Sequence, residues 1–431
     1  QMVAKGSFST QKPNDLLKAF DLKPLSEALN VPSFGNMRYE SANGQDTFKS
    51  FTVRFGDTEN AVSMTGSLER EKKQKLSYKA TINFNRFDYA QWQNMLSELN
   101  WKNLTDGEFA DFKLKLHADT FVYQGKNFKN VNADFAKNGY KFQINGGSME
   151  AAGETIVNFE GGSIIQNDKV GLVLMLAGKS ARLDELLKTV SPSADFPKVL
   201  AQSAIFKGNT TIYADGFNLE IQEFSLDKTK LSGNVRYEET KPLPTIRIKL
   251  FAQNVNIDDY AGYRKPKEKV SVFALINNAK NYVSQLTFLK NYVGTFDLAG
   301  NNIVFFGAPI EKITLNGEVV NNTLKITKAD IRNLDNASLS GSVDFSGLNE
   351  KVISIPTLKV NFGTPQLSLF MDKIGLTANE ESLKDLKDFK TELTLAEQGD
   401  EWAVDMNNVV GDLGLTLDGK LKTTDAGTTY N

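Results

Sequence analysis

The 431-residue chain contains no cysteine and only one histidine, His117. Without cysteine it can form no disulfide, thiolate nucleophile or iron–sulfur cluster, and one histidine cannot build a multi-histidine metal site. It also lacks any run of the roughly 18 consecutive apolar residues that a membrane-spanning helix needs. We therefore predict a protein that is not an enzyme and that holds no metal ion and no cofactor.

The chain also has almost no surplus of charge of either sign. Its 50 Lys and Arg nearly balance its 52 Asp and Glu, which gives a net charge of −2. This balance argues against nucleic acid as a partner, since nucleic-acid-binding proteins carry a basic surplus. The one local basic cluster is RKPKEK, from Arg264 to Lys269. Two interpretations of it stay open: a solvated turn, or a segment that contacts a lipid headgroup layer.

What the sequence does contain is alternation of apolar and polar residues with a period of two, which indicates strands with one apolar face. FKLKL at 112–116, IRIKL at 246–250 and LKVNF at 358–362 show it. The expected fold is mainly β: an elongated, twisted antiparallel sheet curled into a groove, built from repeated hairpin units with a few interspersed short helices. Expected hairpin turns are Asn138-Gly139, Asn145-Gly146, Asp215-Gly216, Asn316-Gly317 and Asp418-Gly419, and also Gly146-Gly147 and Gly161-Gly162.

Internal similarity divides this succession of strands into repeats. Each copy has a glycine, a short strand, a polar turn and a longer apolar strand, and the anchoring glycines are Gly66, Gly153, Gly233, Gly341 and Gly419. We expect a partial first unit with a helix at 1–60 and repeat units at 61–150, 151–228 and 229–336. The last of these has a helical insertion at about 270–290. A further repeat unit and an incomplete final copy fill 337–431, and all are expected to form one continuous body.

Helical periodicity predicts short helices at residues 15–29, 89–99, 183–190 and 380–389, which we expect to cover an edge or mouth of the sheet. Asn14 is the expected N-cap of the first. Trp92 and Trp101 flank the second, where they either cap the core or meet a membrane interface.

Candidates for catalysis are few. His117 has the solvent-facing parity of its strand, where an exposed structural histidine is the simpler interpretation. Asp258 and Asp259 are adjacent and point in different directions, as in the acidic start of a helix. None of these residues forms the acid, base or nucleophile arrangement that an active site requires.

A family resemblance rests on the order of strands in three stretches: NGYKFQINGGSMEAAGETIVNFEGG, FNLEIQEFSLDKTKLSGNVRYEE and VVNNTLKITKADIRNLDNASLSGSVDFSG. Each has a strand, a short polar strand and a strand with a small residue before glycine. Between the repeats lie segments with an aspartate among apolar residues, at 255–260 and 181–187. This pattern resembles the AsmA family of bacterial envelope proteins from about Ala61 onward. It departs from the family in having no N-terminal membrane anchor and in its incomplete final copy.

The resemblance implies a periplasmic protein whose hydrophobic β-groove conducts phospholipid between the inner and outer membranes of a Gram-negative envelope and supports outer-membrane integrity. It implies an inner-membrane tether through an N-terminal anchor outside this sequence, contact with one or both membranes, and possible envelope protein partners. The residues expected to line the groove and to contact acyl chains share the apolar parity of their strands. They are Tyr78, Ile82, Phe84, Leu114, Leu116, Phe142, Ile144, Leu172, Leu174, Leu176, Phe217, Leu219, Ile221, Ile246, Ile248, Leu250, Leu358, Val360 and Phe362.

Two other functions stay open. One is an envelope structural or assembly factor, a packed β spacer that supports outer-membrane biogenesis and carries no lipid. The other is a polysaccharide-binding β-repeat module, which is disfavoured because most of the 29 Phe have the apolar parity of strands instead of an exposed position beside polar residues.

Overall fold

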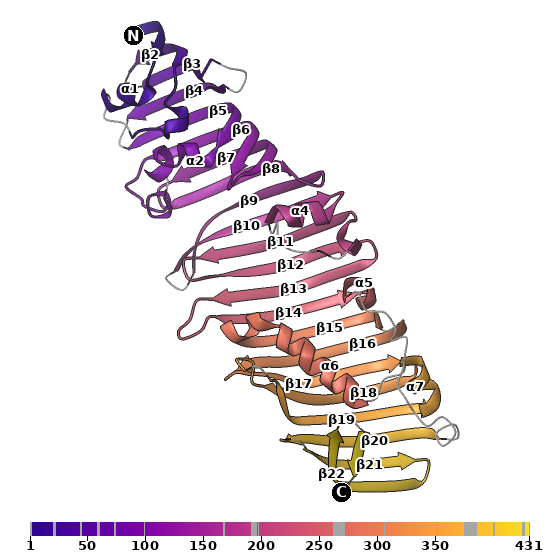
Figure 1. Cartoon of the computed structure of the whole chain (residues 1–431). Coiled ribbons are helices and arrows are strands. Elements are labelled where there is room, and N and C mark those ends of the chain that lie inside the picture. The colour runs from indigo at the N-terminus through magenta and orange to yellow at the C-terminus, as the bar shows by residue number, and fades with distance from the viewer. Residues whose placement is uncertain are drawn as a thin grey trace. The chain divides into compact units, whose positions relative to one another are not determined.

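The computed structural model describes residues 2–19, 23–43, 45–57, 61–72, 75–98, 100–166, 169–190, 196, 198–261, 272–305, 307–350, 352–374, 386–399, 401–424 and 427–430. The fold is mainly β, as predicted, with open, curled sheets of mostly antiparallel strands and a few short helices (Figure 1). The chain divides into two compact units. Unit 1 contains Gln1–Phe196 and Leu200–Ala214, and unit 2 contains Pro197–Val199 and Asp215–Asn431.

Unit 1 is a sheet of eleven strands that pair in chain order. The strands are β1 (Met2–Thr10), β2 (Ser33–Ala42), β3 (Gln45–Phe55), β4 (Val62–Lys72), β5 (Leu76–Asp88), β6 (Asp111–Tyr123), β7 (Lys126–Asn138), β8 (Lys141–Ala151), β9 (Thr155–Gln166), β10 (Lys169–Ser180) and β11 (Ala204–Tyr213). Its helices are α1 (Pro13–Ala19), α2 (Tyr89–Trp92), α3 (Trp101–Leu104) and α4 (Leu183–Val190), with 3-10 turns η1 (Glu27–Leu29) and η2 (Met95–Glu98). A further 3-10 turn, η3 (Lys198–Leu200), has residues in both units.

Unit 2 repeats this plan with strands β12 to β23, again paired in chain order. The strands are β12 (Gly216–Leu226), β13 (Thr229–Glu238), β14 (Thr245–Gln253), β15 (Val293–Phe305), β16 (Ala308–Val320), β17 (Thr323–Leu334), β18 (Ala337–Ser346), β19 (Ser354–Gln366), β20 (Lys387–Gln398), β21 (Glu401–Val410), β22 (Leu413–Thr424) and β23 (Gly427–Tyr430). Its helices are α5 (Ile257–Ala261), α6 (Val272–Gln285) and α7 (Leu367–Ile374), with the 3-10 turn η4 (Thr287–Asn291). Helix α6 and η4 occupy the predicted insertion.

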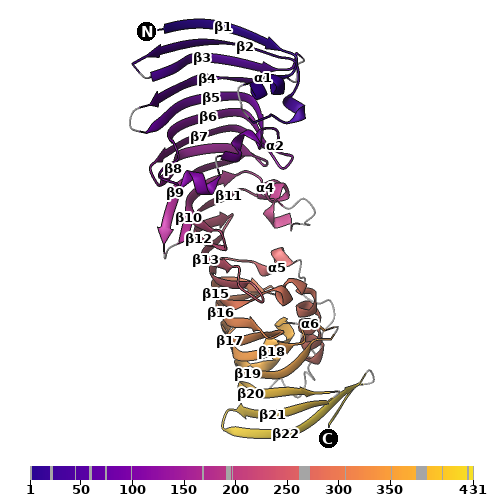
Figure 2. The same ribbon diagram turned by 90° about the vertical axis from the view of Figure 1, so that its left-hand side faces the viewer.

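One pair in each unit is parallel, β5 with β6 and β14 with β15, a feature that hairpin signals do not predict. A parallel pair needs a long crossover, and these crossovers contain α2 with α3 and α5 with α6. Figure 2 shows α1, α2 and α4 along one side of the strands of unit 1, and α5 and α6 along one side of those of unit 2; in unit 1 the strands curve visibly. Helical connections follow β1, β5, β10, β14 and β19, so a helix recurs after every four or five strands.

Four glycines occupy equivalent positions in the sheet. Each lies in the second-to-last strand before a helical connection. At Gly66, Gly161, Gly233 and Gly341 an added Cβ would lie 2.0–2.1 Å from a carbonyl oxygen of the next strand. Only glycine fits such close backbone approach, which accompanies strong twist and curl. Gly153, the expected second anchor, lies instead in the turn between β8 and β9 with φ +70°. Gly161 is its structural counterpart in the second copy.

Several predicted turns are wrong. Residues 145–147, 161–162, 316–317 and 418–419 lie inside strands β8, β9, β16 and β22. At Asn145-Gly146 a register shift leaves Asn145 as an extra residue opposite β7, so this signal marks a β-bulge. At Asn316-Gly317 the register also shifts, but the extra residue is Thr327 on the neighbouring strand β17. The turns near Asn138-Gly139 and Asp215-Gly216 do exist, at residues 139–140 and 214–215.

Two of the four predicted helices, at 15–29 and 89–99, are interrupted in the structure. Of the predicted helix at 15–29, residues 15–19 belong to α1 and residues 27–29 form η1, while 20–22 lie outside the described residues. Residues 23–26 are non-helical and contain Pro24, which cannot donate a helical hydrogen bond. Asn14 does not cap α1; its side chain brackets the backbone of Leu25 through two hydrogen bonds, of 2.8 and 3.1 Å. Of the predicted helix at 89–99, residues 89–98 form α2 and η2 with a turn at 93–94, and residue 99 lies outside the described residues. The helix predicted at 183–190 is confirmed as α4.

The helix expected at 380–389 is wrong where the structure describes it, because Lys387 begins β20. Residues 380–385 lie outside the described residues. From Phe389 onward the side chains alternate, with Leu393 and Leu395 facing the neighbouring apolar residues of β19, so the period-two signal outweighs the helical one.

Candidate functional site

The register of unit 1 places its predicted lining residues on one face of the sheet, which we call the apolar face. One row runs from Leu114 through Phe135 to Ile144. It continues through Gly161 to Leu174. Neighbouring rows on the same face contain the rest of the predicted set in this unit: Tyr78, Ile82, Phe84, Leu116, Phe142, Leu172 and Leu176.

Unit 2 has the same arrangement. Ile221 pairs with Gly233, and Gly233 pairs with Leu250. This row crosses the sheet through Leu298, Leu315 and Gly341 to Val360 and continues through Leu393 to Met406 and Leu417. The adjoining rows contain the other predicted residues of this unit, all on its apolar face: Phe217, Leu219, Ile246, Ile248, Leu358 and Phe362.

Most of these side chains are neither buried nor fully exposed. Phe84, Phe142 and Ile144 are buried, Phe217 is 37% exposed, and the other fifteen are half-buried. A packed sandwich interior would bury nearly all of them. The described part of each unit contains no second sheet against its apolar face. The apolar faces are therefore accessible to a ligand over part of their area.

Helices cover one end of the apolar face of unit 1. Trp92 of α2 packs against Phe84 and Phe87, with ring centroids 5.3 and 5.8 Å apart. Leu25 and Leu29, from the segment around η1, complete this buried cluster. Trp92 is thus a core residue, as one of the two interpretations expected. The cluster does not include the half-buried rows toward the other end of the strands.

In unit 2 helices cover both ends of the apolar face. Helix α6 buries Ile276 and Val283 against one end and is fixed by an ion pair of 2.6 Å between Lys280 Nζ and Glu397 Oε1. Helix α7 covers the opposite end, where Phe370 meets Phe362 at 4.8 Å between ring centroids. The row through Leu298, Leu315 and Val360 lies between the two covered ends and is half-buried.

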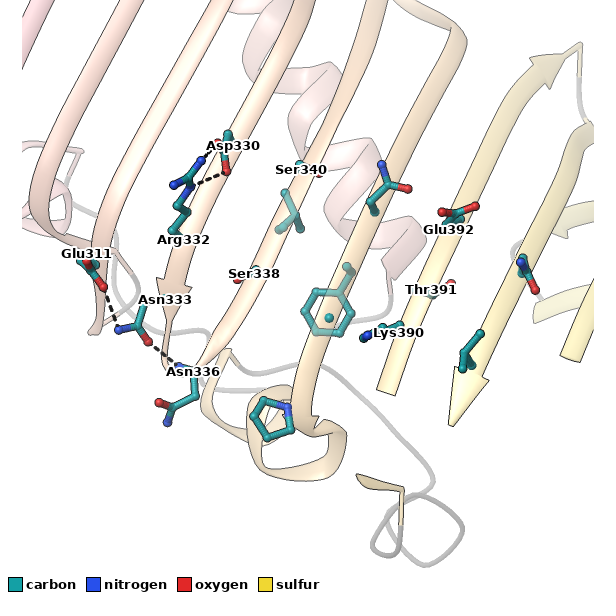
Figure 3. Close-up of a pocket in the computed structure, with 17 residues that line it drawn as sticks. Glu311, Asp330, Arg332, Asn333, Asn336, Ser338, Ser340, Lys390, Thr391 and Glu392 are labelled. Atoms are coloured by element: carbon teal, nitrogen blue, oxygen red, sulfur yellow. Dashed lines mark hydrogen bonds and ion pairs between the residues drawn. The ribbon is translucent and has the colours of Figure 1, made fainter. Parts of the chain in front are cut away.

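The opposite, polar face carries shallow hollows between charged and amide side chains. One of them, with a volume of about 850 Å³, lies on unit 2 over β16 to β21. Figure 3 shows it on the strands in front of α6, with the ion pair between Arg332 and Asp330 and the hydrogen bond from Asn333 to Glu311. Four of the polar side chains that line this hollow are thus paired with one another.

His117 also lies on the polar face, as predicted from its parity, with 36% of its side chain exposed. Its ring nitrogens lie 2.8 Å from Asn132 Oδ1 and 3.0 Å from Asp119 Oδ1. The bonds to Asn132 and then Asp119 raise the pKa of His117, because both partners are acceptors and favour a ring with two N–H groups. The contacts fix the imidazole on the sheet surface.

The remaining polar residues that the sequence singles out do not come together in one site. Asp258 and Asp259 lie in the first turn of α5, as predicted, and Asp258 accepts a 2.8 Å hydrogen bond from the Gly307 N–H. The basic cluster at 264–269 lies outside the described residues. Within the described ranges, no group of three or more acidic or histidine residues is placed to hold a metal ion. A search of the same ranges also finds no helix with the length and apolarity needed to cross a bilayer.

A buried lysine on the apolar face was not predicted. Lys137 pairs with Phe112 and Phe142 in its row, its side chain is 0% exposed, and its Nζ donates to the carbonyls of Phe109 and Gly139. Asp111 lies 3.8 Å away and also binds Lys75 at 2.7 Å. This network fastens the end of the β5–β6 crossover to the β7–β8 turn.

The network should make the stability of unit 1 depend on pH. Burial raises the pKa of Asp111, but hydrogen bonds from Lys75 and the Gly139 N–H, with the charges of Lys75 and Lys137, lower it overall below 3.8. A carboxyl with a lowered folded pKa stabilises the fold above its unfolded pKa, and that contribution is lost as the pH falls through the folded pKa. We expect Asp111→Asn to cost about 1–2 kcal/mol at pH 7 and less at pH 3.

Urea unfolding at pH 7, 5, 4 and 3 measures this difference. Glu160→Gln, at an exposed position on the polar face of β9 in the same unit, is the control and should change stability by less than about 0.5 kcal/mol at each pH. A stability gap between wild type and Asp111→Asn that stays constant down to pH 3 would contradict the assignment.

Another unpredicted polar group lies on the apolar face near the end away from α2. Arg70 and Asp46 pair across β4 and β3, with Arg70 Nη1 3.6 Å from Asp46 Oδ2. The hydroxyls of Tyr39 and Ser41 donate to Asp46 Oδ1 at 2.7 and 2.9 Å. We call Arg70 and Asp46 the rim pair. Parity alone could have revealed it, since Arg70 follows Met64, Gly66 and Leu68 at every second position.

Comparison with known proteins gives no identification: no protein-family model, no curated protein and no solved structure matches the chain. The resemblance to the AsmA family therefore stays a prediction. The geometry defines a protein of open, curled, mostly antiparallel sheets, each with one accessible apolar face.

Proposed function

We propose that the apolar faces bind phospholipid acyl chains and that the protein is an AsmA-like periplasmic conduit between the inner and outer membranes, without catalytic activity. The observation that carries this proposal is that half-buried apolar rows cross the strands of each unit and stay uncovered by a second sheet in the described part of the chain. Rows of this kind run across many strands. Many side chains therefore contact the ligand together, and no single one is indispensable.

The energetics suit a lipid ligand. Each methylene exposed to water costs about 0.8 kcal/mol, so a 16-carbon chain resists leaving a bilayer by about 12 kcal/mol. An apolar surface that accepts the chain removes most of this barrier. A headgroup can remain in water, because the sheet is open. Binding of this kind needs no reactive side chain, in keeping with the scarcity of histidine and cysteine.

Lipid extraction tests the proposal directly. We expect the chain, purified without detergent from a Gram-negative host, to carry phospholipid at one or more molecules per chain, seen both by native mass spectrometry and by thin-layer chromatography of the extract. Organic-solvent delipidation followed by refolding should yield a protein that takes up phospholipid again from vesicles. A chain that is lipid-free as purified and takes up none from vesicles would contradict the proposal.

One observation favours a second candidate, the non-conducting envelope spacer. Helices α6 and α7 cover both ends of the apolar face of unit 2, and so use part of the area that acyl chains would occupy. A spacer would keep these helices in place and bind envelope proteins instead of lipid. The extraction experiment separates the two functions, since only the conduit carries phospholipid.

A further inference from the structure

The rim pair lies where an apolar row meets a polar row. Ser41, Asp46, Arg70 and Tyr78 are successive partners in one row across β2 to β5. The next row on the same face contains Tyr39, Phe48, Leu68 and Ala80, all half-buried. The helix-covered cluster of unit 1 does not include these residues. A molecule on the apolar face would therefore meet two opposite charges at the end of its apolar contact surface.

The two charges of the rim pair are held in different ways. Asp46 is fixed, because Tyr39 and Ser41 donate to one carboxylate oxygen and Arg70 faces the other. The bond from Tyr39, followed by that from Ser41, keeps the pKa of Asp46 below its ordinary value despite partial burial, so the group is ionised at neutral pH. Arg70 is held more loosely. Its contact with Asp46, at 3.6 Å, is longer than a hydrogen bond, and 49% of its side chain is exposed.

These features fit a ligand that carries both charges itself. A guanidinium has five N–H donors in a fork that matches a phosphate, and a fixed carboxylate accepts from an ammonium group. Resting on the proposed function, we infer that the rim pair is a headgroup site for a zwitterionic phospholipid: Arg70 binds the phosphate, Asp46 binds the ammonium, and the acyl chains lie along the row of Phe48, Leu68 and Ala80. A purely anionic lipid would satisfy Arg70 and leave Asp46 facing a negative headgroup.

The test uses the full chain, delipidated and then exposed to vesicles of equimolar phosphatidylethanolamine and phosphatidylglycerol with identical acyl chains. Native mass spectrometry gives the ratio of the two bound lipids. We expect wild type to favour phosphatidylethanolamine by about fivefold, the effect of one charge contact at a partly exposed site. Asp46→Asn should abolish or reverse the preference, since Arg70 then attracts the anionic lipid without opposition. Arg70→Gln should increase the preference for phosphatidylethanolamine, because the carboxylate of Asp46 then repels phosphatidylglycerol without a neighbouring positive charge.

A matched control exists on the polar face of the same strands. Arg38 and Glu40 form an ion pair of 2.9 Å, with 51% and 22% of their side chains exposed, and Glu40→Gln should leave the lipid ratio unchanged. If Asp46→Asn and Arg70→Gln, checked for fold by circular dichroism, bind lipid at the wild-type ratio, the headgroup site is overturned while the proposed function stands. If wild type binds neither lipid, the proposed function itself fails.

A separate experiment tests whether the site binds the headgroup as part of a lipid or as a soluble compound. Glycerophosphoethanolamine, which has the headgroup without acyl chains, should bind at least about tenfold more weakly than the vesicle lipid, because burying even a few methylenes contributes more than that factor. Equal binding of this soluble compound would overturn the assignment to a lipid.

Discussion

Three aspartates on the apolar face of β10 are expected to reduce bound phospholipid about tenfold or more, whereas three on the other face of the same strand are not. The apolar-face residues are half-buried and lie in three neighbouring rows of the sheet. A carboxylate beside a hydrocarbon chain loses hydration without gaining a partner, at about 2–3 kcal/mol for each charge at depth in an apolar medium. The changes are Leu172→Asp, Leu174→Asp and Leu176→Asp.

The control has the same charge, strand and number of substitutions. Val173→Asp, Met175→Asp and Ala177→Asp alter the polar face of β10, where Met175 is 43% exposed. Both triple variants are compared by transfer of fluorescent phospholipid between vesicles and by native mass spectrometry. Thermal unfolding confirms that each is folded. Normal transfer by the apolar-face variant would show that this face is not the lipid path. Equal losses in both variants would show that added charge, and not its position, is responsible.

The location of the apolar faces could be predicted from the sequence because strand parity depends only on local alternation. Leu114, Ile248 and Val360 lie in different strands, and for each of them two polar neighbours in the sequence are enough to indicate which face of the strand it occupies. A one-residue error would have placed the whole strand's side chains on the wrong face, so the prediction is sensitive to register. The strands that carry the predicted residues are long, and their alternation has few interruptions, so the rule can be applied along most of their length.

Features that depend on contacts between strands could not be predicted in this way. Asn145-Gly146 reads as a turn, but the residues that decide between turn and bulge are on the neighbouring strand β7. The parallel pairing of β5 with β6 depends on the crossover returning to the same side, which alternation does not encode. Lys137 is polar by type and yet buried on the apolar face, because two carbonyls and Asp111 satisfy it there.

The rim pair shows what a stricter use of parity could have found. Arg70 shares the parity of Leu68, and Asp46 shares that of Phe48, so the rule that places the leucines would also have placed both charges on the apolar side. A charge at an apolar position is unusual and indicates a partner or a ligand. The partner itself depends on the pairing of β3 with β4, which the sequence does not show.

Gly161→Ala is expected to destabilise unit 1 by about 3 kcal/mol, although it adds a single methyl group. The new Cβ would lie 2.0 Å from the carbonyl oxygen of Val173, so β9 and β10 would have to separate or lose their register. Neither partner is a flexible side chain that could move aside. The same close approach at Gly66, Gly233 and Gly341 indicates that the curl of the sheet depends on glycine at this position of each repeat.

Gly146→Ala is the matched control, since an added Cβ there meets no atom within 4 Å and the residue does not have positive φ. It should leave stability unchanged or raise it by up to about 1 kcal/mol, through the loss of conformational freedom in the unfolded chain. A Trp402→Phe background leaves Trp92 and Trp101, both in unit 1, as the fluorescent reporters of urea unfolding. If Gly161→Ala unfolds at the same urea concentration as Gly146→Ala, the curl tolerates a side chain at this position, and the four glycines do not define the repeat.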